Sequence, residues 1–326
     1  MSRLVTIFGG AGFVGRYIAR RLAQDGWRIR IACRRPNEAL FIRPYGVVGQ
    51  IEPVLCNIRD ETSVRAAMQG ADAVVNCVGI LTGQGRNSFD AVHVQGAQLI
   101  ARTASALGVD RLVHLSALGG APNSDYARSK AQGEAAVLAA FPNAMILRPS
   151  VIFGPEDGFF NKFARMSVMS PLLAITGADT SFQPVYVDDV AQAAVMGVNG
   201  TARGAYDLGG PDVETLRTLM QRMLTTIDRK RSVVNLPWFI AAIVATAADT
   251  AQILSRGLFR NTLLSRDQLR NLQADSVVPL DAQGFAALGI IPTPMSAILA
   301  DYLWRFRPNG QYDAIQASAK NLRKAS

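Results

Sequence analysis

Short apolar runs alternate with helix-like segments from the start of the chain to about Pro211. The runs are rich in β-branched residues and predict strands near Leu4 and over residues 27–33, 51–58, 72–79, 111–117 and 144–150. Between them, apolar residues at helical spacing predict helices that include residues 61–68 and 89–107. This alternation predicts an α/β fold with a doubly wound parallel sheet and a ligand crevice at the carboxyl ends of the strands.

The stretch VTIFGGAGFVGRYIARRLA, residues 5–23, is typical of a strand, a tight turn and an amphipathic helix. Gly9, Gly12 and Gly15 fall in or beside the turn. The free N–H groups and positive dipole of a helix N-terminus attract a pyrophosphate there, provided that no Cβ obstructs it. Because a strand and a helix flank the glycines, we favour a nucleotide site over an ordinary strand-to-helix turn.

The same alternation of strands and helices predicts how the chain divides into domains. We predict a dinucleotide-binding Rossmann domain over residues 1–160, to which residues 182–210 return. Residues 211–326 are helix-rich and are expected to form a smaller C-terminal lobe, with residues 161–181 contributing to the crevice.

Composition narrows the class of protein. The chain has 326 residues, of which 49% are hydrophobic, and three cysteines without a CxxC pair, which favours a globular protein of a reducing compartment. Because the first strand begins near Leu4, we expect no signal peptide and a cytoplasmic location. The net charge of +9 comes from scattered arginines without an RNA-binding motif, so we expect an anionic cofactor and an anionic membrane or protein surface, and no nucleic acid.

The end of the second strand bears on the choice of cofactor. It reads ACRRP, with Arg34 and Arg35 where a NAD site usually has an acidic residue nearby. Two guanidinium groups and no carboxylate favour the 2′-phosphate of NADP(H) over NAD(H). A solvated surface pair of arginines is the alternative.

A second candidate feature is Tyr126, which precedes Lys130 by four residues. On a helix this spacing places both side chains on one face, where the ammonium group is expected to lower the pKa of the phenol and to hold the ribose. Tyr126 is then a proton donor or acceptor for hydride transfer, with Ser116 bonded to the same substrate oxygen.

Several stretches together resemble the extended and atypical short-chain dehydrogenase/reductase superfamily. They are the glycine loop, the Tyr126/Lys130 pair, LRPSVIFGP at 147–155, QPVYVDDVAQA at 183–193 and GAYDLGGP at 204–211. Within that superfamily, PSVIFGPEDGFFNKFARM and QPVYVDDV are most similar to the NADPH-binding accessory subunits of respiratory complex I (NADH:ubiquinone oxidoreductase) and their bacterial relatives. The resemblance covers essentially the whole chain.

The resemblance implies roles for individual residues. It assigns the pyrophosphate to Gly9, Gly12, Phe13, Val14 and Gly15, the adenosine phosphate to Arg34 and Arg35, and the adenine to Asn57 and Ile58. It assigns the second ribose to Val78, Gly79 and Lys130, and the nicotinamide to Pro149, Ser150 and Val151.

The chain also departs from the superfamily pattern. Asn57 stands where Asp is more common, and a helix that often begins Asn-Val-x-Gly-Thr here reads HVQGA, starting at His93. The segment from Ser116 to Tyr126 is shorter than in the sugar-nucleotide epimerases. These departures affect a contact between that helix and the site, and the alignment of Ser116 with Tyr126.

Other polar residues have simpler interpretations. His93 and His114 lie in apolar segments with no further His or Cys at ligand spacing, so we expect no metal. Asp188 and Asp189 are adjacent at a strand end, so their side chains should point apart, and they are expected to form a structural turn into a helix.

The run at 229–260 carries basic and apolar residues together. Its apolar core, residues 236–248, is shorter than the roughly 20 residues that span a bilayer. We favour a core helix of the lobe for Trp238 to Ala248. In the alternative, Trp238, Phe239 and Ile240 enter a membrane interface while Arg229, Lys230 and Arg231 meet acidic headgroups or an acidic partner.

Two functions stay open. The first is an accessory subunit of complex I, with the other complex I subunits as partners, a mainly structural cofactor, and a peripheral position on the cytoplasmic face of the inner membrane. The alternative is an active NADP(H)-dependent reductase, epimerase or dehydratase of a small or quinone-pathway substrate, which the intact Tyr126/Lys130 pair supports.

Overall fold

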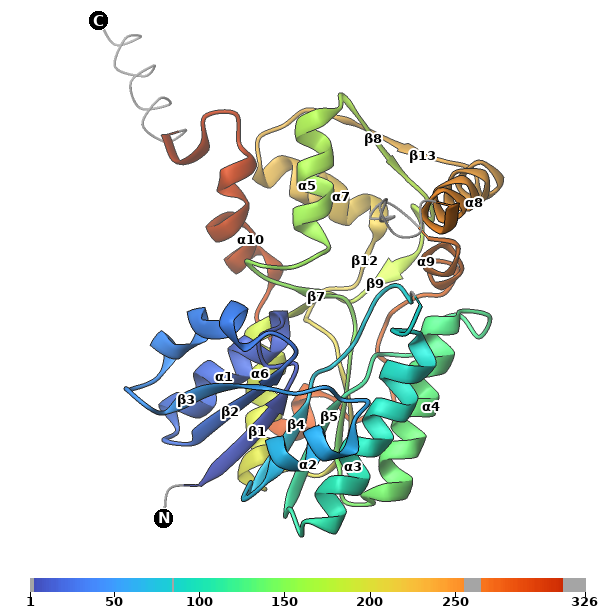
Figure 1. The fold of residues 1–326 in the computed structure, drawn as a ribbon. Helices are drawn as coiled ribbons and strands as arrows, with labels where there is room; N and C mark the ends of the chain where they lie inside the picture. Colours follow the sequence, from blue (N-terminus) through green and yellow to red (C-terminus); the bar gives the residue numbers. More distant parts are fainter. Residues whose placement is uncertain (1–2, 84, 255–264, 313–326) are drawn as a thin grey trace, which may run out of the picture.

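A seven-stranded sheet forms the centre of the larger part of the molecule (Figure 1). This computed structural model describes residues 3–83, 85–254 and 265–312. Across the sheet the strands lie in the order β11 (Gly204–Leu208), β6 (Met145–Pro149), β5 (Arg111–Leu115), β4 (Ala73–Asn76), β1 (Leu4–Phe8), β2 (Arg28–Cys33) and β3 (Ile51–Leu55). Every neighbouring pair in this sheet is parallel.

The order of the strands reverses direction between β1 and β4. β2 and β3 follow on one side of β1, while β4, β5, β6 and β11 follow on the other. The predicted doubly wound parallel sheet is therefore confirmed. At such a reversal, the loops after the two central strands diverge and leave a crevice at their carboxyl ends.

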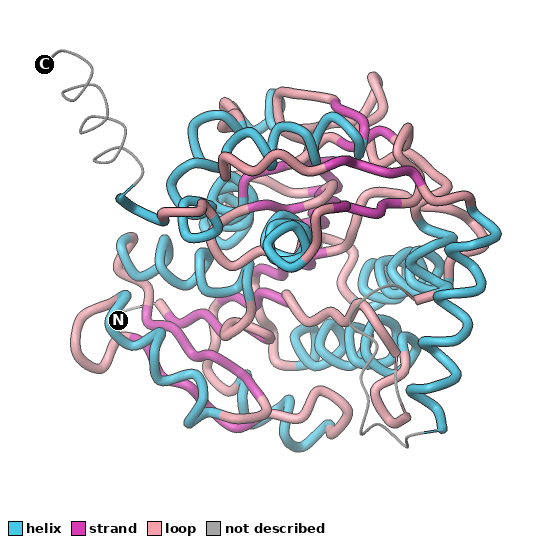
Figure 2. Tube along the Cα trace, turned by 90° about the horizontal axis from the view of Figure 1, so that it is seen from above, coloured by secondary structure: helices cyan, strands magenta, loops and turns pink. Residues whose placement is uncertain are grey.

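Helices cover both faces of the sheet, because alternate residues of each strand face opposite sides. On one face, Val5, Ile7, Ile29 and Ile31 pack with α1 (Phe13–Gln24) and α6 (Val187–Asn199). On the other, Phe8, Val74, Leu112 and Ile146 pack with α2 (Glu61–Met68), α3 (Gly96–Ala106) and α4 (Asp125–Ala140). Seen from above, the strands run through the interior and helices lie around them (Figure 2).

The helix predicted over residues 89–107 consists of two kinds of helix. A π-helix covers Asp90–Gln95, and α3 continues from Gly96. Such π-helical turns occur frequently at functional sites. A 3₁₀ segment, Pro36–Tyr45, connects β2 to β3.

The C-terminal part packs above the carboxyl edge of the sheet and has a core of its own (Figure 1). Two-stranded sheets pair β7 (Ile152–Phe153) with β10 (Val185–Tyr186), β8 (Leu172–Ile175) with β13 (Ser232–Asn235), and β9 (Ser181–Phe182) with β12 (Glu214–Thr215). The helices are α5 (Phe160–Met169), α7 (Leu216–Thr226), α8 (Trp238–Leu254), α9 (Arg266–Asn271) and α10 (Met295–Leu303), with 3₁₀ turns at Phe285–Leu288, Trp304–Phe306 and Gly310–Tyr312.

One C-terminal segment returns to the sheet domain. Phe285, Leu288 and Ile290 are buried in the core formed by α1, α6 and the sheet. The backbone N of Asp207, in the edge strand β11, donates to the carbonyl of Gln283 at 2.8 Å. This return was not foreseen from the sequence, since the segment's local pattern is not that of a sheet-covering helix.

Helix α8 is not the core helix that the sequence analysis favoured. Its large apolar side chains face outward, with Phe239 67% and Ile243 66% exposed, whereas the buried positions are Ala241 and Ala245. That interpretation was therefore wrong, because the helix buries its small residues and exposes its large ones. Among the described residues, no helix is long and apolar enough to cross a membrane.

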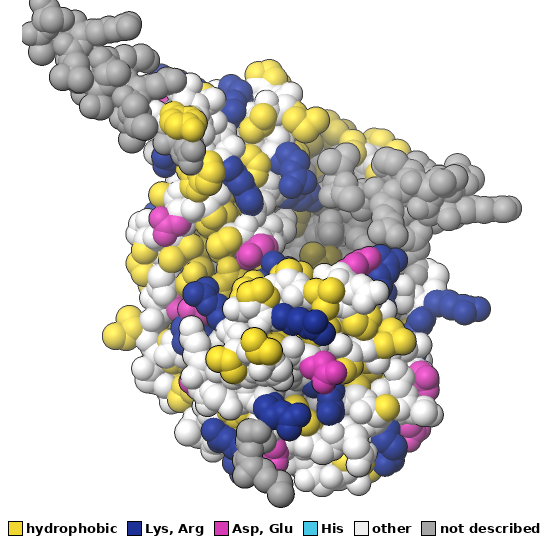
Figure 3. All heavy atoms as spheres, turned by 60° about the vertical axis from the view of Figure 1, so that its left-hand side comes forward, with side chains coloured by type: hydrophobic (Ala, Val, Ile, Leu, Met, Phe, Trp, Pro, Cys, Tyr) yellow, Lys and Arg dark blue, Asp and Glu magenta, His cyan; other side chains and the backbone are white. Residues whose placement is uncertain are grey.

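Charged side chains are spread over the surface. On the face drawn in Figure 3, Lys and Arg side chains lie scattered among apolar and polar ones and form no continuous band. The scattered distribution inferred from the sequence is thus visible on that face.

Candidate dinucleotide site

The glycine-rich turn joins β1 to α1 at the reversal point of the sheet. Gly9 has φ of +74°, a left-handed conformation that favours glycine, and a Cβ on it would lie 3.1 Å from the backbone N of Val78. A Cβ on Gly15 would lie 2.6 Å from the Cα of Gly10. These two glycines allow the turn to close against α1 and against the loop after β4.

Gly12 is in a different environment. It is exposed at the N-cap of α1, and a Cβ there would approach only the carbonyl oxygen of Gly9, at 3.1 Å. Among the described residues no side chain caps this helix end, so its first N–H groups are left for a ligand. The turn therefore fits a pyrophosphate, which needs both free N–H groups and the space left by a missing side chain.

Phe13 and Val14 follow the turn but lie in different surroundings. The half-buried Phe13 ring lies edge-on to Tyr17, with ring centroids 6.1 Å apart, and next to Gly154. Val14 is 8% exposed and belongs to the core beneath the sheet. Only the Phe13 side chain is thus available to a ligand in the crevice, whereas Val14 offers its backbone.

Arg34 and Arg35 follow β2 and are both exposed. Arg35 donates from Nη1 to Oε1 of Glu38 at 3.0 Å. Arg34 has no hydrogen bond or ion pair with any other part of the chain that the structure describes. Of the two, Arg34 is therefore the guanidinium group that a phosphate meets without competition.

Asn57 and Ile58 lie in the loop after β3. The Asn57 side-chain oxygen accepts a hydrogen bond from the backbone N of Arg59 at 3.2 Å, and its own backbone N donates to Ser63 Oγ at 3.0 Å. These bonds hold the loop and leave the Asn57 amide group as a donor. The Ile58 side chain lies close to Gly96, where a Cβ would come within 2.8 Å of it.

Val78 and Gly79 follow β4 and lie beside the glycine turn. Asn76, buried at the end of β4, accepts a hydrogen bond from the Val78 backbone N at 3.1 Å. Its amide nitrogen lies 3.1 Å from Nδ1 of the buried His114. Burial lowers the pKa of His114 to about 3, so this histidine is a neutral acceptor that orients Asn76 and, through it, the loop.

Tyr126 and Lys130 lie on α4, in its first two turns, as predicted. Nζ of Lys130 donates to the carbonyl of Leu115, at the end of β5, at 2.7 Å. Burial raises the pKa of Tyr126 to about 12 and lowers the pKa of Lys130 to about 8. The expectation that Lys130 lowers the pKa of the phenol is thus wrong for this structure, because burial dominates and the ammonium group is engaged with Leu115.

Ser116 follows β5 at the same edge of the sheet. Its backbone N donates to the carbonyl of Leu147 at 2.7 Å, and its side chain is buried. Among the described residues, Ser116 Oγ has no hydrogen-bond partner. A buried hydroxyl without a partner is costly, so the arrangement fits an oxygen or nitrogen of a bound ligand at this point.

Pro149 ends β6, and Ser150 and Val151 follow it where the chain turns toward the C-terminal part. The Pro149 carbonyl accepts from the backbone N of Leu118, and the Val151 carbonyl from that of Val185, both at 2.9 Å. Ser150 Oγ donates to the carbonyl of Ser276 at 2.7 Å, so its side chain is bonded to the C-terminal part. These contacts fix the backbone of the segment along one wall of the crevice.

The comparison with known families agrees with this geometry. Residues 5–209, which hold the sheet and the glycine turn, match the model of the NAD dependent epimerase/dehydratase family. The chain belongs to this family. The resemblance to the short-chain dehydrogenase/reductase superfamily is thereby confirmed.

Individual relatives extend over most of the chain. It is 30% identical to the mitochondrial NADH-ubiquinone oxidoreductase 40 kDa subunit of Neurospora crassa, over 98% of this chain and 84% of that one. It is 32% identical to the mitochondrial NADH dehydrogenase [ubiquinone] 1 alpha subcomplex subunit 9 of Arabidopsis thaliana, over 94% of this chain and 79% of that one. A ceramide reductase of Caulobacter vibrioides is 29% identical over 72% of this chain and 74% of its own length.

A solved structure supports the fold. The Bordetella bronchiseptica enzyme WbmH in complex with NAD+ superposes with a TM-score of 0.68, covering 95% of this chain and 100% of that chain at 17% identity. At this identity the likeness establishes the shared fold alone.

His93 is a site residue whose role the sequence analysis missed. It lies in the π-helix, and its Nε2 accepts from the backbone N of Ile80 at 3.0 Å. Its Nδ1 lies 2.8 Å from Ser129 Oγ, whose hydroxyl donates to the carbonyl of Tyr126 at 2.8 Å. Nδ1 must therefore carry the proton that bonds to Ser129, so His93 is neutral, and burial lowers its pKa to about 4.

The contact between this helix and the site is thus made by the His93 imidazole. The His93 ring also packs edge-on to Tyr126, with ring centroids 5.6 Å apart, and stacks on Phe89 at 5.5 Å. Gly133 permits the close approach, since a Cβ there would lie 2.0 Å from the His93 carbonyl. The departure at residue 93 was visible in the sequence, but its contact with α4 was not.

The paired acids of this family member are structural, as predicted. Asp188 accepts two hydrogen bonds from Arg21, both at 2.8 Å, and Asp189 accepts from the backbone N and the hydroxyl of Thr293 at 2.6 and 2.9 Å. Their side chains point to different parts of the molecule, one to α1 and one to the segment before α10. Neither faces the Tyr126 region.

Neither a metal centre nor a reactive thiol is found among the described residues. In the ranges that the structure covers, no three or more His, Cys, Asp or Glu side chains are grouped so as to hold a metal ion. Cys33, Cys56 and Cys77 are free thiols, with Cys56 buried and the other two partly exposed. Burial raises the pKa of Cys77 to about 12, so its thiol is protonated at neutral pH.

Proposed function

We propose that this protein is an accessory subunit of respiratory complex I in which a bound dinucleotide is mainly structural. The observation that carries the proposal is similarity over almost the whole chain to proteins named as subunits of NADH-ubiquinone oxidoreductase. The dehydrogenase-type fold alone does not distinguish a subunit from an enzyme.

We assign the dinucleotide to the residues at the carboxyl edge of the sheet. Gly9, Gly12 and Gly15 would hold the pyrophosphate, Val78, Gly79 and Lys130 the second ribose, and the backbone of 149–151 the nicotinamide end. Bound there, the nicotinamide could supply hydride chemistry. The chain's own contribution is to hold these groups together, since a ligand that binds only the folded state stabilises it.

The state of the Tyr126 phenol supports a structural role. A pKa raised to about 12 makes Tyr126 a weak acid and leaves it protonated at neutral pH. Lys130, which would assist it, is bonded to the Leu115 carbonyl. The Lys130 side chain thus ties α4 to the end of β5, while the Tyr126 ring packs against Phe89 and His93.

The exposed apolar face of α8 supports a peripheral contact with an anionic membrane on the cytoplasmic face of the inner membrane. Phe239 and Ile243 on this helix are two-thirds exposed. Lys230, eight residues before α8 in the chain, is exposed, while Arg229 and Arg231 each donate from Nε to a backbone carbonyl. Of the predicted basic anchors, we therefore assign headgroup contact to Lys230 alone.

We assign NADP(H) rather than NAD(H) to the site. Arg34→Asp combined with Arg35→Ser should weaken NADPH binding more than NADH binding, because charge-assisted bonds to the 2′-phosphate are worth about 1.5–3 kcal/mol each and a carboxylate would repel it. Arg34 should account for most of the loss, since Arg35 is already paired with Glu38. Titration of both nucleotides against the single and double variants measures this, and an unchanged NADPH/NADH affinity ratio would contradict the assignment.

Replacing Tyr126 by phenylalanine tests the subunit proposal against catalysis. The change removes only the phenolic oxygen, so the chain should still migrate with complex I on native gels of solubilised membranes, at a wild-type level of quinone reduction. Loss of the nucleotide through Gly12→Val should instead reduce assembly. A wild-type chain that migrates alone would overturn the proposal.

The second candidate is an active NADP(H)-dependent reductase, epimerase or dehydratase. The unpartnered Ser116 hydroxyl and the Tyr126/Lys130 pair favour it, as does the similarity to a protein named ceramide reductase. A Tyr126→Phe strain that assembles complex I normally but lacks one defined metabolite would establish this function.

A further inference from the structure

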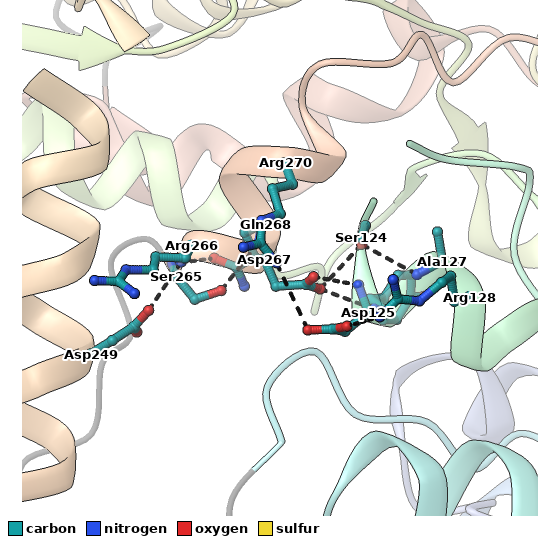
Figure 4. A network of polar contacts seen from close by, with 11 residues as sticks. Ser124, Asp125, Ala127, Arg128, Asp249, Ser265, Arg266, Asp267, Gln268 and Arg270 are labelled. Carbon is teal, nitrogen blue, oxygen red and sulfur yellow. Dashed lines mark hydrogen bonds and ion pairs between the residues drawn. The ribbon is translucent and has the colours of Figure 1, made fainter. Parts of the chain in front are cut away.

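A carboxylate from the C-terminal part binds the beginning of the helix that carries Tyr126 and Lys130. Asp267, on α9, accepts hydrogen bonds from Ser124 Oγ at 3.1 Å and from the backbone N of Asp125 and Tyr126 at 2.5 and 3.0 Å. Figure 4 shows Asp267 pointing into the start of α4, with these contacts as dashed lines. Asp267 and Tyr126 are more than 140 positions apart in the chain.

These bonds satisfy groups that the helix itself leaves free. The first N–H groups of α4 have no intrahelical partner, and a negative charge at this end also interacts favourably with the helix dipole. Ser124 Oγ accepts a hydrogen bond from the backbone N of Ala127 and donates one to Asp267. Asp267 therefore holds the Tyr126 turn through its backbone, without touching the phenol.

The same short helix is bonded to α8. The backbone N of Arg266 donates to Asp249 at 3.1 Å, and Arg266 Nε donates to Thr246 Oγ1 at 2.7 Å. Arg270, one turn further on, lies 4.0 Å from Asp125. Helix α9 thus lies between α8 and α4 and has polar contacts with both.

Within the part of the chain that the structure describes, the fully buried side chains of α8 are small. Its buried side chains include Ala241 and Ala245, and an open cavity of about 500 Å³ lies between it and α9, lined by Trp238, Phe239, Ala242, Thr246, Arg266, Leu269, Arg270 and Gln273. Small side chains bury little apolar area, so packing alone fixes this helix weakly. The polar contacts with α9, and through Asp267 with α4, therefore contribute to its position.

We propose that Asp267 is a positioning residue that couples dinucleotide binding at α4 to the placement of the exposed apolar face of α8. Nucleotide that orders α4 also orders α9 and α8, and a partner that holds α8 tightens nucleotide binding by the same factor, because coupling between sites is reciprocal. This rests on the proposed function, in which α8 is the contact surface of the subunit. The dinucleotide then controls when the subunit presents that surface.

Hydrogen exchange of the full-length protein with and without saturating NADPH tests the coupling. In the wild type, NADPH should slow exchange at the glycine turn and also in α8, although no nucleotide contact is assigned to that helix. In Asp267→Asn the protection of α8 should disappear while that of the glycine turn persists, and the Kd for NADPH should rise about fivefold, the lower end of typical coupling. If Asp267 had a merely structural role, its replacement would change hydrogen exchange in the glycine turn and in α8 alike, with or without nucleotide.

Asp275→Asn is the matched control. Asp275 lies in the same part of the chain and accepts a hydrogen bond from the backbone N of Ser181 at 2.7 Å, away from α4. It should retain the wild-type pattern. Protection of α8 that persists in Asp267→Asn, or that is absent from the wild type, would overturn the coupling. If NADPH does not protect α8 of the wild type but does protect the glycine turn, the nucleotide assignment still stands. If it protects neither region, the nucleotide assignment and the coupling both fail.

Discussion

NADPH should no longer raise the melting temperature of the Gly12→Val protein. A valine at the exposed N-cap of α1 places three carbons where the pyrophosphate must approach, while its Cβ meets only the Gly9 carbonyl at 3.1 Å. The fold without nucleotide should therefore persist. At nucleotide concentrations about 100 times the Kd, the wild type gains about 2.7 kcal/mol from binding, and the variant should lose that gain.

Two other glycines control for steric effects. Gly15→Ala should destabilise the protein with or without NADPH, because its Cβ would lie 2.6 Å from backbone atoms of Gly9 and Gly10. Gly158→Val should leave both the melting temperature and the NADPH shift unchanged, since no atom lies within 4 Å of a Cβ at that position. Calorimetry with increasing NADPH distinguishes the three, and a full shift in Gly12→Val would place the nucleotide elsewhere.

His93→Asn should make the protein more resistant to acid at little cost at neutral pH. An unfolded histidine takes up a proton near pH 6.5, whereas burial lowers the pKa of the folded His93 to about 4. Between these values the unfolded state binds more protons, so the stability of the wild type falls as the pH decreases through this range. At pH 4.5 this costs about 2.5 kcal/mol, which Asn, having no proton to gain, avoids.

Asparagine is suited to this test because it offers both an acceptor and a donor, as the neutral His93 does toward Ile80 and Ser129. Urea unfolding at pH 7.5 and 4.5 measures the difference. Ser129→Ala, which removes the hydroxyl bonded to His93 but no titrating group, should lower the stability by a similar amount at both pH values. An equal difference between His93→Asn and wild type at both pH values would mean that the histidine does not carry the acid response.

The glycine turn and the Tyr126/Lys130 pair on α4 illustrate what local sequence predicts well. The strand, turn and helix around Gly9 to Gly15 follow from hydrophobic period and glycine placement, which act within a few residues. The spacing of Tyr126 and Lys130 placed both on α4. The length of the helix over 61–68 agrees residue for residue with α2, because its apolar positions and its Asp60 cap are local signals.

The chemistry of the same residues was less accessible from the sequence. The pKa of Tyr126 depends on how deeply the phenol is buried and on whether Lys130 has another partner, and the Leu115 carbonyl is that partner. Likewise, the pattern of α8 predicts an apolar helix but not which side of it faces solvent. Only the packing shows that Phe239 and Ile243 are largely exposed, whereas Ala241 and Ala245 are the buried positions of the helix.

By itself, the sequence determined the doubly wound sheet and the glycine turn at its centre, since these follow from periodicity and from spacing along the chain. Most of the residues assigned to the carboxyl edge came instead from the resemblance to the superfamily. Only the tertiary structure decided that Asp267 binds the start of α4, that His93 bonds to Ser129, and that residues 283–290 return to the sheet domain. The physical reason is that each of these is a contact between segments distant in sequence. Its formation depends on the packing of whole elements, and the residues involved carry no local signal for their partners.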